Sequence, residues 1–557
     1  MKNFKFILTF IFAGIFGFSG MLFSQSSDTT KYTGNLKKIA EWQDARFGMF
    51  IHWGPVTLKG TEISWSRGVE VSESEYDSLY MKFNPVNFNA DEWVSVAKAA
   101  GMKYLVLTTK HHDGFCLWNT RQTDYNIMHS PFKRDVVKEL SEACKRQGIR
   151  FGAYYSTCDW YNPDFPKTGA KGAVIREKSD LEAYTTYLKR QIAELLLNYG
   201  PLEVLWFDVP QMFDVQRGQG VIDFARTIQP DILVNDRTRA KGDFDTPEQR
   251  IGGFQNTRPW ETNMTVARQW TWKPNDDVKS LRQCLQALVR TAGGDGNFLF
   301  NISPDFTGRV EPEQVARLKE MGQWLEKYGY SVYGTRGGPF KPTDWGVSTR
   351  KGNKIYLHIL VWSGNKVQIT LPDIGMEIKN CRLVDGSPVK LSKKNKDNVI
   401  EFSAKALQPI NTIVEIEVVG NAMDIKPLEI KAQSLSFRKQ ASASSVGDKT
   451  WHGIRLITNG DWSGYGWSPA KDDKMPWAEV DLEKPQVVSK AIVTECGKAV
   501  KAFEIQYLSG ETWKTAYKGT SIQSGIEFSF PKVTAQKVRL LITESSANPE
   551  ITEIVLY

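Results

Sequence analysis

The stretch MKYLVLTTKHH, residues 102–112, is a short apolar run that ends in two adjacent histidines. It lies between the amphipathic patterns NADEWVSVAKAAG (89–101) and DVVKELSEACKRQG (135–148), which predict helices. We interpret the run as a strand that carries polar side chains at its carboxyl end.

The same alternation of apolar run and helical pattern extends over residues 35–335. Five further runs also end in polar or aromatic residues, at residues 46–54, 149–157, 202–210, 231–237 and 297–305. Strands that alternate with helices over this length predict a parallel (β/α) TIM-like barrel. Active sites of such barrels lie at the carboxyl ends of the strands, so the polar run ends together predict a pocket there.

The remainder of the chain is predicted to be all-β. Residues 336–420 contain short strand-like runs with turn residues between them, which predict a small β-sandwich. Residues 434–557 form a second all-β block that closes with a C-terminal strand. The expected fold class is α/β: a barrel followed by two β-sandwiches.

The N-terminus has the features of a secretory signal peptide. Lys2 and Lys5 accompany an almost wholly apolar stretch, residues 6–23, and small polar residues follow. We expect residues 1–24 to be removed and the protein to be periplasmic or secreted, with an uncleaved membrane anchor as the alternative. The net charge of +8 is modest for 557 residues and no arginine-rich run stands out, so nucleic acid is not an expected partner.

His111 and His112 could be metal ligands, structural residues or substrate-binding residues. Neighbouring residues on a strand point to opposite faces, so they rarely chelate one ion together, and no third ligand has a recognisable spacing. The six cysteines lack CxxC spacing, which argues against a disulfide scaffold and a structural zinc site. We therefore expect no metal and no cofactor, and we favour substrate binding by the two histidines.

Two carboxylates are candidates for chemistry. Asp208 ends a strongly apolar run, where an unpartnered charge would cost several kcal/mol. Such an aspartate could attack a sugar carbon, and glycoside hydrolysis requires a second carboxyl group nearby. The strongest candidate for the second is Glu261, because the surrounding tryptophans would raise its pKa. Its rivals are Glu62, Asp245 and Glu248.

Seven motifs together resemble the family 29 glycoside hydrolases, the retaining α-L-fucosidases. They occur within residues 35–420 and read ARFGMFIHWG, TTKHHDGFCLW, FGAYYST, LWFDV, LVNDR, WETNMT and GNFLFNISP. The resemblance implies an exo-acting enzyme that releases terminal α-L-fucose from a fucosylated oligosaccharide or glycoconjugate by double displacement. The alternatives are a related glycosidase for a fucose-like sugar, such as an α-L-galactoside, and a catalytically silent glycan-binding protein.

The resemblance also implies roles for individual residues. Asp208 matches the nucleophile, and Glu261 is similar in context to the acid/base. The expected substrate-binding residues are His52, Trp65, His111, His112, Tyr154, Trp206, Arg237 and Trp270. One departure concerns the residue before Trp65, which is Ser64 here where family members commonly have glutamate.

The last block, residues 434–557, resembles discoidin-type (F5/8 type C) modules, which often bind carbohydrate. Its Trp462, Tyr465 and Trp467 could stack on a sugar or serve the core. The resemblance leaves open a structural calcium ion near Asn459 and Asp461.

Overall fold

The computed structural model describes residues 35–169, 174–462, 464–522 and 527–557. The predicted signal peptide, residues 1–24, lies outside these ranges. Across the described ranges, no helix combines the length and the apolar character that a membrane crossing requires.

A parallel sheet of seven strands forms the first part of the fold, in the order β5-β4-β3-β2-β1-β7-β6. Its strands are β1 (Phe47–Ile51), β2 (Tyr104–Lys110), β3 (Arg150–Ser156), β4 (Val204–Asp208), β5 (Leu233–Val234), β6 (Glu261–Thr265) and β7 (Asn297–Ile302). All but two of their residues are buried, as expected for parallel strands with both faces covered. The sheet confirms the predicted (β/α) architecture.

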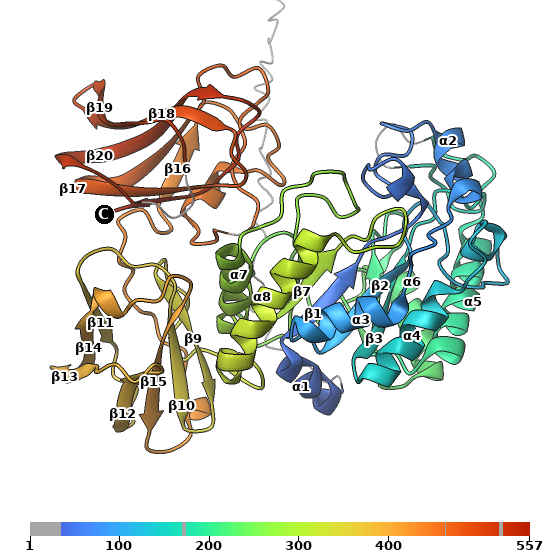
Figure 1. The fold of residues 1–557 in the computed structure, drawn as a ribbon, viewed down its shortest axis with the longest axis horizontal. Helices are drawn as coiled ribbons and strands as arrows, with labels where there is room; N and C mark the ends of the chain where they lie inside the picture. Colours follow the sequence, from blue (N-terminus) through green and yellow to red (C-terminus); the bar gives the residue numbers. More distant parts are fainter. Residues whose placement is uncertain (1–34, 170–173, 463, 523–526) are drawn as a thin grey trace, which may run out of the picture. The chain divides into compact units, whose positions relative to one another are not determined.

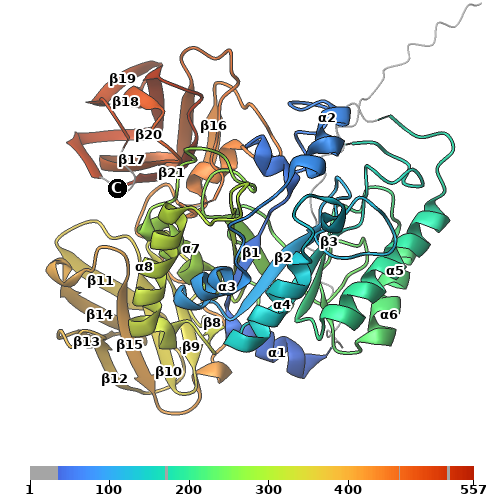
Figure 2. The same cartoon turned by 45° about the vertical axis from the view of Figure 1, so that its right-hand side comes forward.

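Helices surround the strands on the outside, as Figures 1 and 2 show. They are α1 (Leu36–Ala45), α2 (Glu73–Ser78), α3 (Ala90–Ala99), α4 (Val136–Gln147), α5 (Leu181–Tyr199), α6 (Val215–Ile228), α7 (Leu281–Gly293) and α8 (Pro312–Tyr328). The helix predicted after the His111–His112 run is α4. It is capped at its start by Asp135, whose side chain accepts a hydrogen bond from the backbone N–H of Lys138, and at its end by Gly148 in the left-handed conformation.

An irregular segment, Phe244–Glu248, takes the place of an eighth strand between the edge strands β5 and β6. Parallel bridges join Asn235 to Phe244 on one side, and Asp245 to Trp260 and Glu248 to Asn263 on the other. We call it the closing segment. No sequence signal marks it, because DFDTPE has no apolar run and because Pro247 offers no backbone donor to a regular ladder.

Two antiparallel β-domains follow. The first has a sheet of order β12-β15-β10-β9-β8 and a smaller one of order β11-β14-β13. Its strands are β8 (Arg336–Gly337), β9 (Gly346–Lys351), β10 (Lys354–Ile359), β11 (Lys366–Leu371), β12 (Ile378–Leu383), β13 (Lys390–Lys394), β14 (Asp397–Ser403) and β15 (Thr412–Val418). Side chains from both sheets, such as Leu357 and Ile369, share one core.

The C-terminal domain contains a sheet of order β16-β17-β20-β18-β19, and β21 pairs with β17. Its strands are β16 (Gln440–Ala443), β17 (Trp477–Glu495), β18 (Val500–Ser509), β19 (Thr512–Gly519), β20 (Glu527–Ser545) and β21 (Ile551–Leu556). Trp467 is fully buried in its core, and Trp462 is 5 % exposed and packs with the barrel core. Neither tryptophan is therefore free to stack on a sugar.

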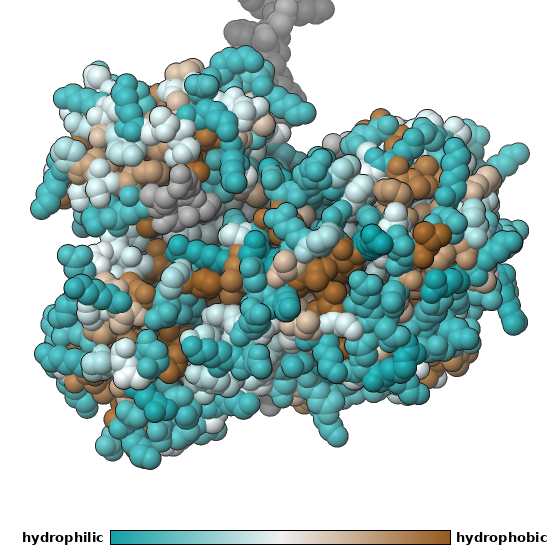
Figure 3. All heavy atoms as spheres, viewed as in Figure 1, coloured by the Kyte–Doolittle hydropathy of each residue, from teal (hydrophilic) through white to brown (hydrophobic). Residues whose placement is uncertain are grey.

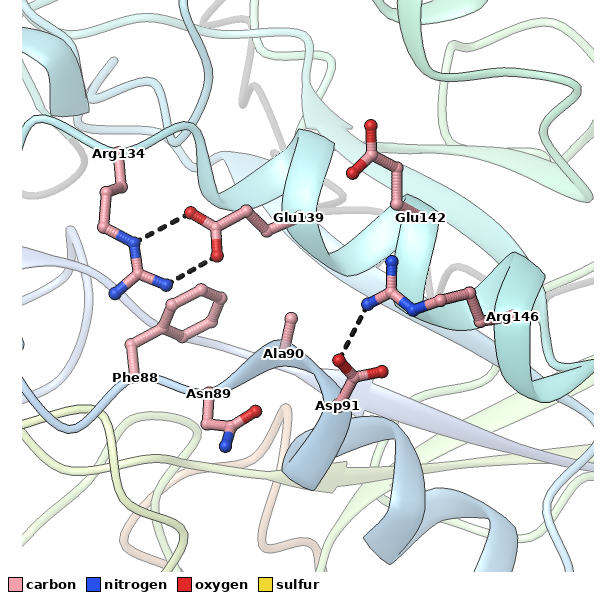
Figure 4. Close-up of a pocket in the computed structure, with 8 residues that line it drawn as sticks. All are labelled: Phe88, Asn89, Ala90, Asp91, Arg134, Glu139, Glu142 and Arg146. Carbon is pink, nitrogen blue, oxygen red and sulfur yellow. Dashed lines mark hydrogen bonds and ion pairs between the residues drawn. The ribbon is translucent and has the colours of Figure 1, made fainter.

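The surface offers no single apolar face on the side shown in Figure 3, where hydrophilic residues surround separate apolar patches. A hollow of about 400 Å³ beside α3 and α4 is lined by five charged side chains, four of which form two ion pairs. Figure 4 shows Arg134 bound to Glu139 and Arg146 bound to Asp91. Because these charges satisfy each other, the hollow is a salt-bridged surface.

Arg46 is a buried connection between the start of β1, the loop between α7 and β7, and the residue before β8. Its guanidinium donates to Asp295 Oδ1 at 2.5 Å, to the Gly296 carbonyl at 3.0 Å and to the Thr335 carbonyl at 2.6 Å. The Arg46 side chain is fully buried, so its loss would leave a carboxylate and two carbonyls without this donor.

We expect Arg46→Met to lower the free energy of unfolding by about 3–5 kcal/mol, because an uncompensated charge remains buried. Urea or thermal unfolding measures the change. Lys379→Met is the matched control, since Lys379 pairs with Glu417 at the surface and its loss should cost less than about 1 kcal/mol. Equal effects of both changes would contradict the prediction.

Candidate active site

A cavity of about 270 Å³ lies at the carboxyl ends of the barrel strands. It is lined by Phe50, His52, Ile63, Trp65, His111, His112, Tyr154, Trp206, Asp208, Val209, Arg237, Glu248, Asn263, Trp270 and Trp451. Every site residue predicted from the sequence lines it except Glu261. Glu248, one of the rival candidates for the second carboxyl group, also lines it. Five lining residues were not singled out from the sequence: Phe50, Ile63, Val209, Asn263 and Trp451.

The three histidines share one arrangement, in which a neighbouring side chain holds Nδ1. The partner of His52 is Asn301 Oδ1 at 2.7 Å, that of His111 is Ser64 Oγ at 2.6 Å, and that of His112 is Ser156 Oγ at 2.8 Å. Each contact fixes the ring orientation and leaves Nε2 for a ligand. Asn301 and Ser156 occur in the quoted sequence motifs, but the motifs did not show that each of these side chains contacts a histidine ring.

All three imidazoles are neutral at ordinary pH. Burial lowers the pKa of His52 to about 3 and that of His112 to about 4, and it lowers the pKa of His111 well below its usual value. Asn301 donates its amide N–H to the Trp270 carbonyl at 2.8 Å, so its oxygen faces His52 and accepts from Nδ1–H. Nε2 of His52 is then an acceptor, which suits the hydroxyl of a sugar.

Ser64, the departure from the family pattern, is part of this support. Its hydroxyl oxygen contacts His111 Nδ1 and accepts the backbone N–H of Asp113 at 2.9 Å. Trp65 is 43 % exposed at the rim and packs edge-on against His112, with ring centroids 5.3 Å apart.

Asp208, the last residue of β4, is held as an anion. Arg237 donates to its Oδ1 at 2.9 Å and the Tyr154 hydroxyl donates to its Oδ2 at 2.9 Å. Burial alone would raise the pKa of Asp208, but the charge of Arg237 and the hydrogen bonds from Arg237 and Tyr154 keep it below its usual value. The carboxylate is therefore ionised and lies inside the cavity.

Glu248 supplies a second carboxyl group, at the end of the closing segment. The Arg237 nitrogen that binds Asp208 also donates to Glu248 Oε2, at 2.8 Å. Burial raises the pKa of Glu248 above its usual value, and the negative charge of Asp208 adds to the rise, against the opposing effect of Arg237. One arginine thus lies between an ionised carboxylate and a carboxyl group that tends to keep its proton.

The structure places Glu261, the predicted acid/base, outside the cavity. It is the first residue of β6, it is fully buried, and its carboxylate accepts from the hydroxyl of Tyr104 and from Trp206 Nε1 at 3.1 Å. Tyr104 begins β2, so this cluster lies at the amino ends of the strands, opposite the cavity. Burial raises the pKa of Glu261 to about 7. Its carboxylate accepts the indole N–H of Trp206 on the side opposite the cavity.

The other two rivals have structural partners. Glu62 accepts the backbone N–H of Trp270 at 2.9 Å and thereby holds the loop that carries this aromatic ring. Asp245 binds Arg258 at 2.5 Å. Neither residue lines the cavity.

The residues that the structure describes contain no group of three or more His, Cys, Asp or Glu side chains that could hold a metal ion. At the position considered for calcium, the Asp461 carboxylate accepts the backbone N–H groups of Ile251 and Gly464 at 2.8 and 3.1 Å. The calcium ion therefore stays a prediction from resemblance.

Known proteins share both the barrel and the C-terminal domain. A sequence profile described as alpha-L-fucosidase matches residues 22–330, more than half of the chain, and an F5/8 type C domain profile matches residues 440–556. The chain belongs to the α-L-fucosidase family. It is a retaining α-L-fucosidase of glycoside hydrolase family 29, and its substrate class is fucosylated glycans.

Individual relatives support the family assignment. Human plasma α-L-fucosidase is 30 % identical over 376 residues, which cover 60 % of this chain and 79 % of the relative. The solved family 29 α-L-fucosidase of Bacteroides thetaiotaomicron, trapped as a covalent intermediate, is 25 % identical with a TM-score of 0.62, over 69 % of this chain and 96 % of that one. The α-L-fucosidase of Vibrio sp. strain EJY3 shares the fold over 95 % of this chain and 99 % of its own, with a TM-score of 0.66 and 23 % identity.

We expect Ser64→Ala to lower kcat/KM for an aryl α-L-fucoside about tenfold, because the buried Nδ1 of His111 loses its partner. Steady-state kinetics measure the change. Ser141→Ala, which removes an exposed hydroxyl on α4, should leave activity unchanged. A Ser64→Ala enzyme with wild-type kinetics would show that His111 needs no support.

Proposed function

We propose that Asp208 and Glu248 carry out the double displacement in this enzyme. Asp208 attacks the anomeric carbon of a terminal α-L-fucose while Glu248 donates its proton to the glycosidic oxygen, so the carbon–oxygen bond to the leaving group breaks as the fucosyl–Asp208 ester forms. Glu248 then takes a proton from water, and the hydroxide oxygen displaces Asp208 to release fucose.

The observation that carries this proposal is the shared contact to Arg237. One nitrogen lies 2.9 Å from Asp208 Oδ1 and 2.8 Å from Glu248 Oε2, which keeps the carboxyl groups near the separation of roughly 5 Å typical of retaining glycosidases. The two pKa values are shifted in opposite directions, as a nucleophile and a general acid require.

The cavity also supports the choice of a single terminal sugar. Its volume of about 270 Å³ suits one monosaccharide unit. Neutral His52, His111 and His112 provide hydrogen-bonding atoms for hydroxyl groups, and Phe50, Trp206 and Trp270 provide apolar surface for the ring and its methyl group. An α-L-galactoside would place a hydroxymethyl group where fucose has the methyl, so comparison of the two aryl glycosides tests the alternative substrate.

We also propose that the enzyme acts outside the cytoplasm on fucosylated oligosaccharides or glycoconjugates. The support is the signal-peptide pattern of residues 1–24. Amino-terminal sequencing of the exported protein should begin near Gln25, whereas an uncleaved anchor would retain Met1.

Substitution of the carboxylates should separate their roles. We expect Asp208→Ala to lose nearly all hydrolysis of an aryl α-L-fucoside. Glu248→Ala should lower kcat/KM about 10²- to 10⁴-fold for a substrate with a poor leaving group. Azide should restore the Glu248→Ala enzyme, because a small anion can replace the water that no longer has a base.

Glu261→Gln is the matched control, since it keeps the shape of a buried side chain that lies below the cavity. It should retain most of the activity, without any response to azide. Azide rescue of a Glu261 variant, together with an active Glu248→Ala enzyme, would return the acid/base role to Glu261.

The pH dependence of kcat/KM should be bell-shaped. Activity is lost as pH falls through the lowered pKa of Asp208, which must be ionised, and as pH rises through the raised pKa of Glu248, which must be protonated. The residual kcat/KM of Glu248→Ala on an aryl α-L-fucoside should lack the alkaline limb, because the group whose deprotonation causes that limb is absent. Loss of that limb in Glu261→Gln instead would contradict the assignment.

A further inference from the structure

One residue of the C-terminal domain lines the catalytic cavity. Trp451 lies in the loop between β16 and β17, more than a hundred residues beyond the last barrel strand, and is 44 % exposed. Large aromatic side chains usually bury themselves, so a tryptophan left half-exposed at the edge of a sugar pocket indicates a ligand-binding surface.

The loop that carries Trp451 is anchored within its own domain. Asp448 Oδ1 accepts the backbone N–H groups of Thr450 and Trp451 at 2.8 and 3.3 Å. His452 contacts the Gly466 carbonyl at 3.1 Å and Glu550 at 3.5 Å. The Trp451 ring stands edge-on to Tyr465, with centroids 6.1 Å apart. These contacts fix the direction of the indole.

The same domain packs against the end of the closing segment. The backbone N–H of Tyr465 donates to the Gln249 carbonyl at 3.0 Å, and the N–H of Ile251 donates to Asp461 at 2.8 Å. A Cβ atom at Gly464 would lie 2.7 Å from the Gln249 carbonyl, so the two backbones are in close contact. These contacts hold residues that directly follow Glu248 in the sequence.

Trp451 therefore lies on the Glu248 side of the cavity. Its neighbour Tyr465 is close enough for the charge of Glu248 to affect it: burial, and then Glu248, raises the pKa of the Tyr465 hydroxyl. A general acid must contact the glycosidic oxygen, so the leaving group leaves the cavity on this side. Trp451 is thus placed where the sugar next to fucose would lie.

We propose that Trp451 binds the leaving group, by stacking its indole on the apolar face of the hexose to which fucose is linked. The C-terminal domain then completes the active site of its own chain and selects substrates with a carbohydrate leaving group. This inference rests on the proposed function of the cavity.

The test compares two substrates in the full-length enzyme: a fucosylated trisaccharide and fucosyl fluoride. In Trp451→Ala, kcat/KM for the trisaccharide should fall about tenfold, because a stacking contact of this size is lost. The value for fucosyl fluoride, which has no sugar leaving group, should stay within about twofold of wild type. Trp451→Phe should recover most of the trisaccharide activity.

Trp513→Ala is the matched control, because this tryptophan of β19 packs over Arg539 in the same domain and does not line the cavity. Trp513→Ala should leave kcat/KM unchanged for both substrates. The inference would be overturned if Trp451→Ala kept the wild-type kcat/KM for the trisaccharide, or if its kcat/KM fell equally for both substrates. Failure of the proposed function looks different: wild type would not hydrolyse fucosyl fluoride, or Asp208→Ala would hydrolyse it normally.

Discussion

The contact of Arg237 with two carboxylates is the interaction on which the site depends. The guanidinium reaches Asp208 at the end of β4 and Glu248 in the closing segment, and it also binds the hydroxyl and carbonyl of Thr246 at 2.9 Å each. It packs over the Trp206 ring at 4.9 Å. A single partly buried cation thus joins the two sides of the barrel opening, keeps one carboxylate ionised and sets the distance to the other.

The neutral histidines complement this charged centre. Because burial removes their charge, His52, His111 and His112 add no further positive potential near Asp208 and act through hydrogen bonds. Their Nδ1 partners fix which ring atom faces a ligand. Substrate recognition and bond cleavage are therefore assigned to different chemical groups within one small cavity.

The sequence predicted the barrel, the β-domains and most of the pocket, because regular strands have apolar runs and their polar ends are visible. It could not place the closing segment, which is held by isolated bridges and contains Pro247. The sequence also could not show that Glu261 lies outside the cavity. Aromatic neighbours indicated a raised pKa correctly, but Glu261 begins a strand, and only strand ends face the cavity. Trp451 had no sequence signal, since a loop residue contacts the barrel only through tertiary packing.

The close approach of Gly464 to the Gln249 carbonyl has a consequence for how the chain can be divided. The family profile ends at residue 330, yet the residue next to Glu248 packs against backbone more than a hundred positions later. A fragment cut after the barrel would expose that carbonyl to water and free the segment that bears the second carboxylate. In this protein the contacts that hold the neighbour of the closing segment therefore come from beyond the residues that the family profile matches.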